Sequence, residues 1–581
     1  MIRSVLVLGL LTGGVPSLAG VPAQKGVPAE KGAEMLLSAM QQEVQRATTQ
    51  LAKSDPAPYF LSYSVYDQEA AVVIATYGGL LQSFAGHRRI ADVTMRVGTP
   101  ALDNTHNENR GSGLTSGTLP LGEDRDAIAR ELWILTNREY RRAAPAFLNV
   151  KTSTTVRSEE EDKSPDFSSE SPQKSVDPAA MSFQFDQAAW KEKIRKYSGY
   201  FRKFPEVYSS HVILQVDKSK FYFVSSEGST VVTGGAMARL VIQAETRAED
   251  GMELLRVETF QAASPDQFPA ESEIVKKIEK MAGDLKALRA APLAEPFDGP
   301  ALLSGRAAAV FFHEVLGHRL EGHRQRGDQE GQTFTKKVDQ PVMPDFLSVV
   351  DDPTLRALNG VSLSGAYSFD EEGEPPSRVE VIKDGILKNF LMSRMPVKNF
   401  AKSNGHGRGQ PGRMPTARQG NLIVTSTKTV KDSELREKFK EEIKKQGKPY
   451  GLYFEDVQGG FTLTMRALPQ AFQVLPVIVW RVYPDGRPDE LVRGVDIVGT
   501  PLAAVTRILL TGDTPQVFNG VCGAESGQVP VSAAAPAMLF SEMEVQKRAQ
   551  SHTRPPILPP PGFESSAPKT PPSSSTSPVK P

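Results

Sequence analysis

The chain has 581 residues, of which 39% are hydrophobic and 23% charged, and its 68 basic and 68 acidic side chains give a net charge of zero. This composition is typical of a globular protein with some disordered sequence, and the length predicts two folded domains. The balanced charge argues against nucleic-acid binding and against a basic membrane-binding surface.

Residues 1–19 are typical of an export signal. Arg3 supplies a positive charge, residues 5–11 form a short apolar core, and Ser17 and Ala19 are small residues before the expected cleavage point. We therefore expect an exported protein, periplasmic or extracellular, with no membrane span once the signal is removed, because no later segment is long and apolar enough. The alternative is a chain anchored in the membrane by an uncleaved N-terminus.

The segment 20–296 is predicted to form an α+β domain. Apolar residues at helical or strand spacing predict its elements. Helices are expected at 32–53, 124–143, 191–203 and 265–289, strands at 59–66, 70–77, 207–216, 220–225 and 239–246, and a loop at 103–118. The stretch 158–177 contains almost no apolar residue, which predicts a disordered insertion.

The segment 297–548 is predicted to be a β-rich domain. One hairpin is expected over 378–392, with Asp384-Gly385 at its turn. Further strand pairs are expected at 477–483 with 490–497, and at 452–458 with 461–468 around Gly459-Gly460, and a charged helix at 431–445. The final residues, 549–581, are rich in Pro and Ser, which predicts a disordered tail.

The sequence His313-Glu314-Val315-Leu316-Gly317-His318 is the strongest functional signal in the chain. Two neutral imidazoles can bind zinc, and a glutamate between them can polarise a metal-bound water. In the common H-E-x-x-H pattern the histidines are four residues apart on one helical face. Here they are five apart, so a straight helix turns the second side chain about 140° from the first. We expect either a π-type bulge eased by Gly317 or an accidental motif in a buried core helix.

A catalytic zinc ion usually has three protein ligands and one water. The nearby candidates for the third ligand are Glu321 and His323, and the remote candidate is Cys522, the only cysteine. A lone cysteine in an exported chain is an inert buried thiol, half of an intermolecular bridge or a metal ligand. The residues alone leave these alternatives open.

Several blocks of the sequence resemble the TldD/PmbA family of metallopeptidases. Residues 313–322 resemble its H-E-x-x-x-H helix, and residues 405–408 with 411–414 resemble its loop of glycine and arginine residues. Residues 521–523, followed by Gly-Gln-Val-Pro at 527–530, resemble its segment with a late cysteine.

The resemblance extends over residues 32–547 and implies a zinc peptidase, usually dimeric, with its active site in the C-terminal domain. It implies that His313, His318 and Cys522 bind one zinc ion per chain and that Glu314 is the general base. Members of the family without these ligands are inactive partners, so the ligands retained here imply the active type. The insertion, the tail and the export signal are atypical, because familiar members are cytoplasmic.

The expected substrates are peptides or unfolded protein segments, and the expected assembly is a homodimer or a heterodimer with a family paralogue. Residues that could bind substrate or stabilise an oxyanion are His323, His406 and Arg413.

Two other functions are compatible with the sequence. The first is a non-catalytic scaffold or binding protein with a structural or vacant metal site, and the second is a hydrolase that acts on something other than peptides. A structural zinc site is closed by four protein ligands, whereas a catalytic site keeps one position open. A fourth metal bond from Glu321 or His323 would therefore favour the scaffold.

Overall fold

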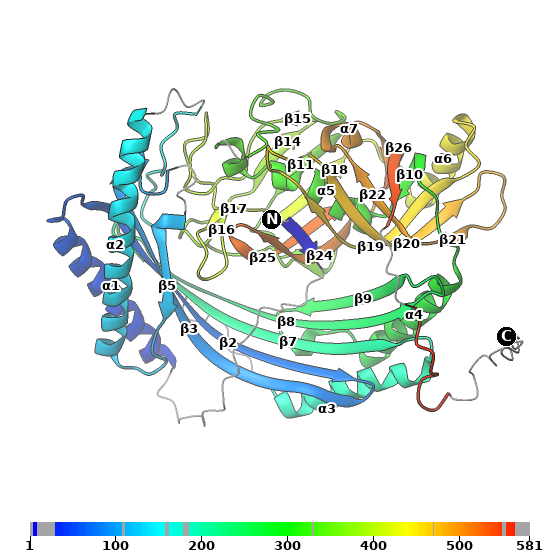
Figure 1. Cartoon of the computed structure of the whole chain (residues 1–581), viewed down its shortest axis with the longest axis horizontal. Helices are drawn as coiled ribbons and strands as arrows, with labels where there is room; N and C mark the ends of the chain where they lie inside the picture. The colour runs from blue at the N-terminus through cyan, green and yellow to red at the C-terminus, as the bar shows by residue number, and fades with distance from the viewer. Residues whose placement is uncertain are drawn as a thin grey trace, which may run out of the picture.

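The computed structural model describes residues 4–7, 29–106, 111–156, 162–177, 185–327, 330–468, 470–548 and 554–563. Over these residues the chain forms a curved 8-stranded sheet in its N-terminal part and a 14-stranded sheet that is mostly from its C-terminal part (Figure 1). The predicted α+β class with a β-rich C-terminal part is confirmed. None of the described helices has the length and hydropathy needed to cross a membrane.

The N-terminal sheet has the strand order β4-β3-β2-β7-β8-β6, with β5 on β3 and β9 on β8. Its strands are β2 (Pro58–Thr76), β3 (Gly79–Thr99), β4 (Leu102–Asp103), β5 (Leu114–Thr118), β6 (Lys174–Val176), β7 (Ser209–Ser225), β8 (Thr230–Arg247) and β9 (Glu253–Ala262). The helices of this part are α1 (Ala29–Leu51), α2 (Arg125–Val156), α3 (Gln187–Gly199) and α4 (Glu271–Ala290).

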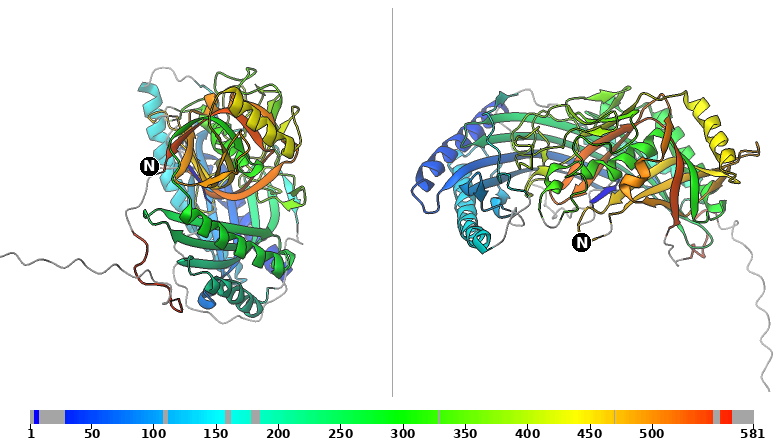
Figure 2. Two further views of the ribbon diagram at one scale, coloured as in Figure 1. Left: turned by 90° about the vertical axis from the view of Figure 1, so that its right-hand side faces the viewer. Right: turned by 90° about the horizontal axis from the view of Figure 1, so that it is seen from above.

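All four helices cover the same face of the curved sheet (Figures 1 and 2). Tyr63 of β2 packs with α1 and α2, and Val73, ten residues further along the same strand, packs with α3 and α4. Both side chains lie on one face because strand residues alternate between faces. On the other face, Phe223 of β7 packs with Phe369 of the C-terminal part. Around Phe223 the sheet is therefore buried on both faces, whereas the first half of β3 is largely exposed.

The long strands correct three predictions. The separate strands expected at 59–66 and 70–77 are the single strand β2, and those expected at 207–216 and 220–225 are the single strand β7. The polar residues that suggested a break are paired across the sheet, as Asp67 of β2 is with Arg89 of β3. The region expected as a loop contains β5, and its residues 107–110 lie outside the described residues.

The C-terminal sheet has the order β15-β14-β11-β18-β25-β24-β1-β19-β10-β26-β22-β20-β21, with β23 on β26. Its strands are β1 (Ser4–Val7), β10 (Phe297–Leu303), β11 (Leu347–Asp351), β14 (Val379–Lys383), β15 (Ile386–Leu387), β18 (Asn421–Ser426), β19 (Gly451–Thr462), β20 (Phe472–Val482), β21 (Glu490–Val492), β22 (Val495–Gly499), β23 (Ile508–Thr511), β24 (Gln516–Ala524), β25 (Gly527–Ala535) and β26 (Met538–Lys547). Two short pairs are β12 (Ala357–Leu358) with β13 (Val361–Ser362) and β16 (Gly407–Arg408) with β17 (Thr416–Ala417). The helices are α5 (Gly305–Val315), α6 (Asp432–Lys445) and α7 (Pro501–Val505).

Helix α5 lies at the centre of the C-terminal core. It packs against β18, β19, β20, β24 and β25, and all its residues except Arg306 are buried. Because β19 also pairs with β20, the strands β19, β10, β26, β22 and β20 close into a ring beside the helix. Ser304 caps the start of the helix, because its Oγ accepts the backbone N–H of Ala307 at 3.1 Å.

The predicted hairpin at Asp384-Gly385 is confirmed, with β14 and β15 joined by two residues whose φ angles are 47° and 76°. Such positive values are required by a tight turn of this kind. The predicted turn at Gly459-Gly460 is wrong, since both residues lie within the continuous strand β19. The glycine at 460 serves close packing instead, because a Cβ there would lie 2.7 Å from Cγ of Glu314.

The predicted disordered insertion is also wrong for its described part, 162–177. Phe167 is 4% exposed and lies between the guanidinium groups of Arg96 and Arg394, each 3.9 Å from the ring centroid. Asp166 accepts hydrogen bonds from Arg326 at 2.9 Å and pairs with His106 at 2.7 Å. Composition failed here because these few residues join the two parts of the chain through specific ion pairs and one aromatic ring, which a count of apolar residues misses.

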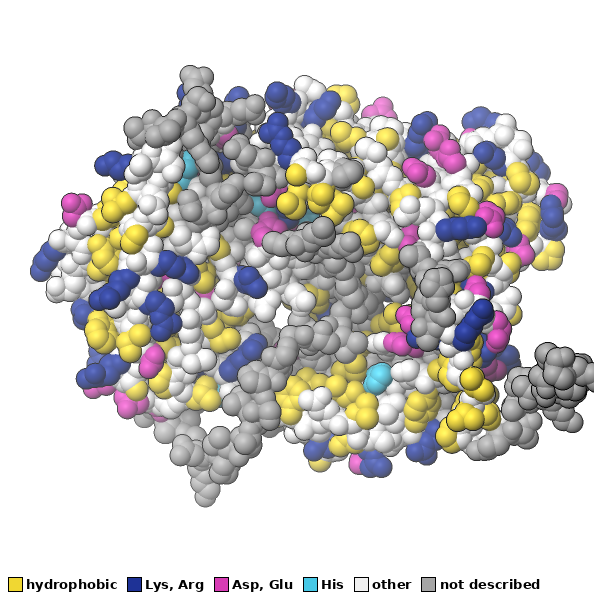
Figure 3. All heavy atoms as spheres, in the orientation of Figure 1, with side chains coloured by type: hydrophobic (Ala, Val, Ile, Leu, Met, Phe, Trp, Pro, Cys, Tyr) yellow, Lys and Arg dark blue, Asp and Glu magenta, His cyan; other side chains and the backbone are white. Residues whose placement is uncertain are grey.

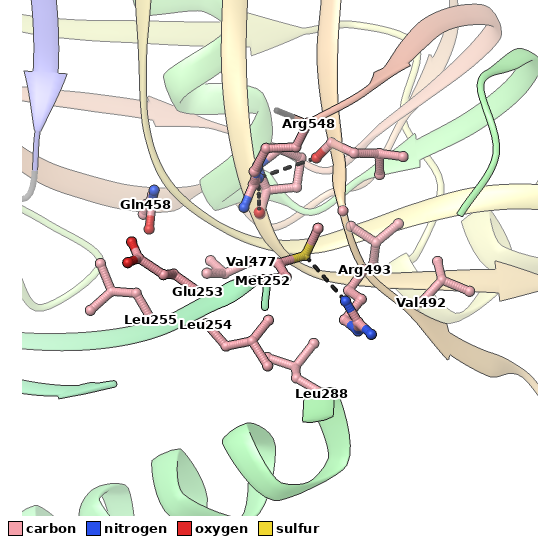
Figure 4. A pocket seen from close by; sticks show the side chains of 14 residues that line it. Met252, Glu253, Leu254, Leu255, Leu288, Gln458, Val477, Val492, Arg493 and Arg548 are labelled. Carbon is pink, nitrogen blue, oxygen red and sulfur yellow. Dashed lines mark hydrogen bonds between the residues drawn. The ribbon is translucent and has the colours of Figure 1, made fainter. Parts of the chain in front are cut away.

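A cavity of about 260 Å³ lies where the curved sheet meets the C-terminal ring (Figure 4). Leu254 and Leu288 line it from one side and Val477 and Val492 from the other. Arg493, also in the lining, is fixed by an ion pair with Asp250 at 2.9 Å. The cavity belongs to the packing of the two sheets.

The predictions for the chain ends lie mostly outside the described residues. Within the predicted signal, Ser4–Val7 form β1, which runs antiparallel between β24 and β19. Within the predicted tail, residues 554–563 form no helix or strand, and Arg554 donates a hydrogen bond to the carbonyl of Glu249.

Replacement of Phe167 by alanine should lower the free energy of unfolding by about 3 kcal/mol, because a buried aromatic ring leaves a cavity between two arginines. Limited proteolysis should then cut within 162–177 faster than in the unaltered chain. Val176→Ala is the matched control, since Val176 lies in the same segment and is 55% exposed. Equal stability and equal cleavage rates for the two variants would contradict the packed arrangement.

Candidate metal centre

The two histidines of the motif are on different elements. Helix α5 ends at Val315 and carries His313 in its last turn, whereas His318 lies in the 3₁₀ turn η4 (Gly317–Arg319). The expected π-type bulge is therefore wrong: the helix stops, and the tighter turn redirects the second ring. A Cβ at Gly317 would lie 1.9 Å from Oε1 of Gln419, so any larger residue here would force the buried Gln419 side chain to move.

Cys522 completes a three-residue cluster with the two histidines. It lies on β24, which packs against α5, and its Sγ is 3.3 Å from Nε2 of His318. One ligand atom from each of His313, His318 and Cys522 lies within 4.8 Å of the others, and all three residues are buried. Residues 204 positions apart are thus brought together by the packing of a strand on a helix end.

The cluster fits a zinc ion in its chemistry. Two imidazoles and one sulfur are donors that zinc prefers. Both ring nitrogens of His313 are buried without a hydrogen-bond partner, although buried polar atoms nearly always have one. Burial alone would raise the pKa of the Cys522 thiol, but the charges of His318 and Arg418 hold it well below its ordinary value. The sulfur is therefore available as a thiolate, the form that binds metals.

Glu314 is fully buried beside this cluster. Neither of its carboxylate oxygens has a hydrogen-bond partner, and burial raises its pKa to about 8. The absence of a side chain at Gly460 on β19 leaves room for it. An unpaired carboxylate next to three metal-binding side chains is arranged to exchange a proton with a water or a substrate.

A second layer of charged residues surrounds the cluster. Glu321 Oε1 lies 3.1 Å from Nδ1 of His318, and Arg324 Nε donates to the other oxygen of Glu321 at 2.7 Å. Arg418 donates to the backbone carbonyl of Cys522 at 2.8 Å and has its Nε 3.6 Å from Glu321. Glu321, which the sequence offers as a metal ligand, therefore faces the ring nitrogen of His318 that points away from Cys522.

The three predicted substrate residues have different surroundings. His323 is 1% exposed and its Nε2 pairs with Glu525, which is itself bound to Arg324. His406 is buried with its Nε2 3.3 Å from Asp351. Arg413 is exposed. The structure thus links only His323 to the second layer of the metal cluster.

Two residues near the cluster were missed by sequence reasoning. Arg418 contacts Cys522, and the amide of Gln419 is 1% exposed, without a hydrogen-bond partner, against Gly317. Both follow the loop that carries Arg413, but the sequence does not show which arginine of that loop turns inward. The only signal in the sequence is that polar residues directly precede the apolar strand β18, and this signal is weak.

Known proteins resemble this chain mainly over its C-terminal part. Residues 298–547 match the model of the PmbA/TldA metallopeptidase C-terminal domain. The metalloprotease TldD homologue of Haemophilus influenzae is 26% identical over 250 residues, 42% of this chain and 48% of that protein. The zinc metalloprotease TldD homologue of Saccharolobus solfataricus is 23% identical over 332 residues, 56% of this chain and 68% of that protein. The chain spans about half the length of most of the relatives it matches, for example 47% of a TldD homologue of Buchnera aphidicola.

Solved structures share the fold over most of the chain. TldE of Thermococcus kodakarensis superposes with a TM-score of 0.55 at 12% identity, covering 87% of this chain and 100% of that one. A Thermotoga maritima protein proposed to modulate a DNA gyrase gives a TM-score of 0.57 at 16% identity, covering 87% of this chain and 99% of that one. Residues 298–547 are therefore a PmbA/TldA-type metallopeptidase C-terminal domain, and through this part the chain is similar to proteins named TldD metalloproteases.

Proposed function

We propose that this chain is a zinc-dependent peptidase that hydrolyses peptides or unfolded protein segments. The observation that carries the proposal is the convergence of His313, His318 and Cys522 within 4.8 Å beside the unpartnered Glu314. One zinc ion held by these three residues would polarise the scissile carbonyl and supply a nucleophilic water at neutral pH.

In this proposal Glu314 is the general base. Its free carboxylate takes a proton from the attacking water and gives it to the leaving amine nitrogen. Burial raises the pKa of Glu314 to about 8, close enough to neutral pH for the carboxyl both to take and to return a proton. A nearby cation would favour its ionised form.

The sheet suggests how a substrate chain binds. Strands β24 and β19 do not pair directly, because β1 lies between them, with Leu6 opposite Cys522 on one side and Gly460 on the other. If β1 is removed with residues 1–19, it leaves a space one strand wide between β24 and β19. Strand β24 carries Cys522, and β19 packs against Glu314. A substrate held there by main-chain hydrogen bonds would be recognised with little dependence on its sequence.

The scaffold alternative requires a site closed by protein ligands. Among the described residues the candidate metal-binding group contains only His313, His318 and Cys522. Glu321 is engaged by His318 Nδ1 and Arg324, and His323 by Glu525. Three ligands favour an open catalytic position over a structural site. A hydrolase acting on other substrates remains the second candidate, and an assay on unstructured peptides separates the two.

We further propose a dimer, with a second copy or with a family paralogue, which the shared fold with TldE of Thermococcus kodakarensis supports.

Lys and Arg side chains are interspersed with Asp and Glu on the face drawn in Figure 3, as the zero net charge leads one to expect. A peptide or protein partner is therefore proposed rather than nucleic acid.

Purified protein should contain about one zinc ion per chain, and Cys522→Ser should lower this content sharply, because a hydroxyl is a poor zinc ligand. Elemental analysis after dialysis measures it. Zinc at the same level in the variant would remove Cys522 from the site.

Glu314→Gln should retain zinc but cleave an unstructured peptide at least about 100-fold more slowly, because the amide cannot accept the water proton. Glu279→Gln is the control, since Glu279 is exposed on α4. A Glu314→Gln variant that binds zinc and keeps full activity would place the base elsewhere.

We propose that residues 1–19 direct export and are removed, so that the mature chain begins near Gly20. N-terminal sequencing of the exported protein measures this. Full-length chain in the cytoplasm with Met1 retained would contradict it, and a membrane-bound chain with Met1 retained would indicate the anchored alternative.

A further inference from the structure

We propose that Glu321 is a positioning residue: it holds the ring of His318 in the tautomer and orientation that present Nε2 to the metal. This inference rests on the zinc site of the proposed function, and it concerns a residue that contributes no metal bond of its own.

The two nitrogens of His318 have separate partners. Nε2 faces Sγ of Cys522 at 3.3 Å, and Nδ1 faces Oε1 of Glu321 at 3.1 Å. An imidazole that binds a metal is neutral and carries its proton on the other nitrogen, and a carboxylate can only accept that proton in a hydrogen bond. Glu321 therefore keeps the N–H on Nδ1 and leaves the lone pair of Nε2 directed at the cluster.

Glu321 is itself rigidly held. It is fully buried, its second oxygen accepts from Arg324 Nε at 2.7 Å, and Arg418 Nε lies 3.6 Å from its first oxygen. Its backbone forms a β-bridge with Leu391, and the next N–H, of Gly322, donates to the Leu391 carbonyl at 2.8 Å. A carboxylate fixed by both side-chain and backbone contacts can orient a ring, which a mobile one cannot do.

The same network reaches the other ligand strand. Arg324 also bonds Glu525 at 3.0 Å, three residues beyond Cys522, and Arg418 bonds the Cys522 carbonyl at 2.8 Å. Glu321 thus lies between two arginines that both contact the β24 end of the site. His313 has no comparable partner on either ring nitrogen. The support is therefore specific to His318, the histidine that lies outside α5.

The test is the dissociation constant for Zn²⁺, measured by competition with a chromophoric chelator. Glu321→Gln should weaken zinc binding by about 10- to 100-fold, the usual cost of removing a residue that orients a metal ligand. Glu330→Gln is the matched control, because Glu330 also contacts Arg324, at 3.4 Å, but does not touch His318. Its zinc affinity should be unchanged.

Glu321→Asp decides the question if Glu321→Gln does not fold. It keeps the negative charge between Arg324 and Arg418 but shortens the reach to Nδ1, so zinc binding should weaken here too. The proposal would be overturned if Glu321→Gln and Glu321→Asp were both folded and bound zinc as tightly as the unaltered chain. With Co²⁺ as the probe, a changed coordination number in Glu321→Gln would make Glu321 a ligand and would also overturn it.

The outcomes separate this inference from the proposed function. An unaltered chain that binds zinc tightly but cleaves no peptide removes the peptidase and leaves the role of Glu321 to be decided by the zinc affinities. An unaltered chain that binds no zinc overturns both.

Discussion

The burial of polar groups without hydrogen-bond partners at the end of α5 is the constraint on which the rest of the site depends. His313 and Glu314 are fully buried, and their side-chain nitrogen and oxygen atoms have no hydrogen-bond partners. Leaving each such group unpaired in a protein interior costs on the order of 1–3 kcal/mol. In the proposed function, the missing partners of these groups come from outside the chain. A cation, water and a peptide together would satisfy all of these atoms.

Close approaches by glycine make the arrangement possible. Gly317 lets the chain turn away from the helix against Gln419, and Gly460 lets β19 pass directly beside Glu314. A side chain at either position would collide with a buried neighbour, Gln419 in the first case and Glu314 in the second. The second layer then fixes what the glycines bring together, because Glu321, Arg324 and Arg418 connect His318 with the strand that carries Cys522. Metal binding, in this account, is a property of the whole C-terminal sheet.

The local chemistry of the site could be predicted from the sequence, but its geometry could not. The motif at 313–318 identified the histidines and Glu314, yet helical periodicity could not show that α5 ends between the two histidines. Cys522 joined them only through the resemblance to a family, since no local pattern connects residues 204 positions apart.

Errors in the predicted fold came from the same cause. Gly459-Gly460 was interpreted as a turn because glycine often marks one, whereas its reason here is a neighbouring side chain that the sequence does not reveal. The polar segment 158–177 was predicted to be disordered, because the sequence does not show that Phe167 and Asp166, in its described part, find their partners on distant elements. Elements with strong local signals, such as the Asp384-Gly385 turn and the helix α6, were predicted correctly.

The central claim, that His313, His318 and Cys522 bind a catalytic zinc ion, is tested most directly by anomalous diffraction at the zinc edge from a crystal of the protein. The account predicts one anomalous peak per chain, with one sulfur about 2.3 Å and two imidazole nitrogens about 2.0–2.1 Å away, and a fourth position occupied by water. A peak at other residues, or a fourth protein ligand such as Glu321 closing the site, would contradict it.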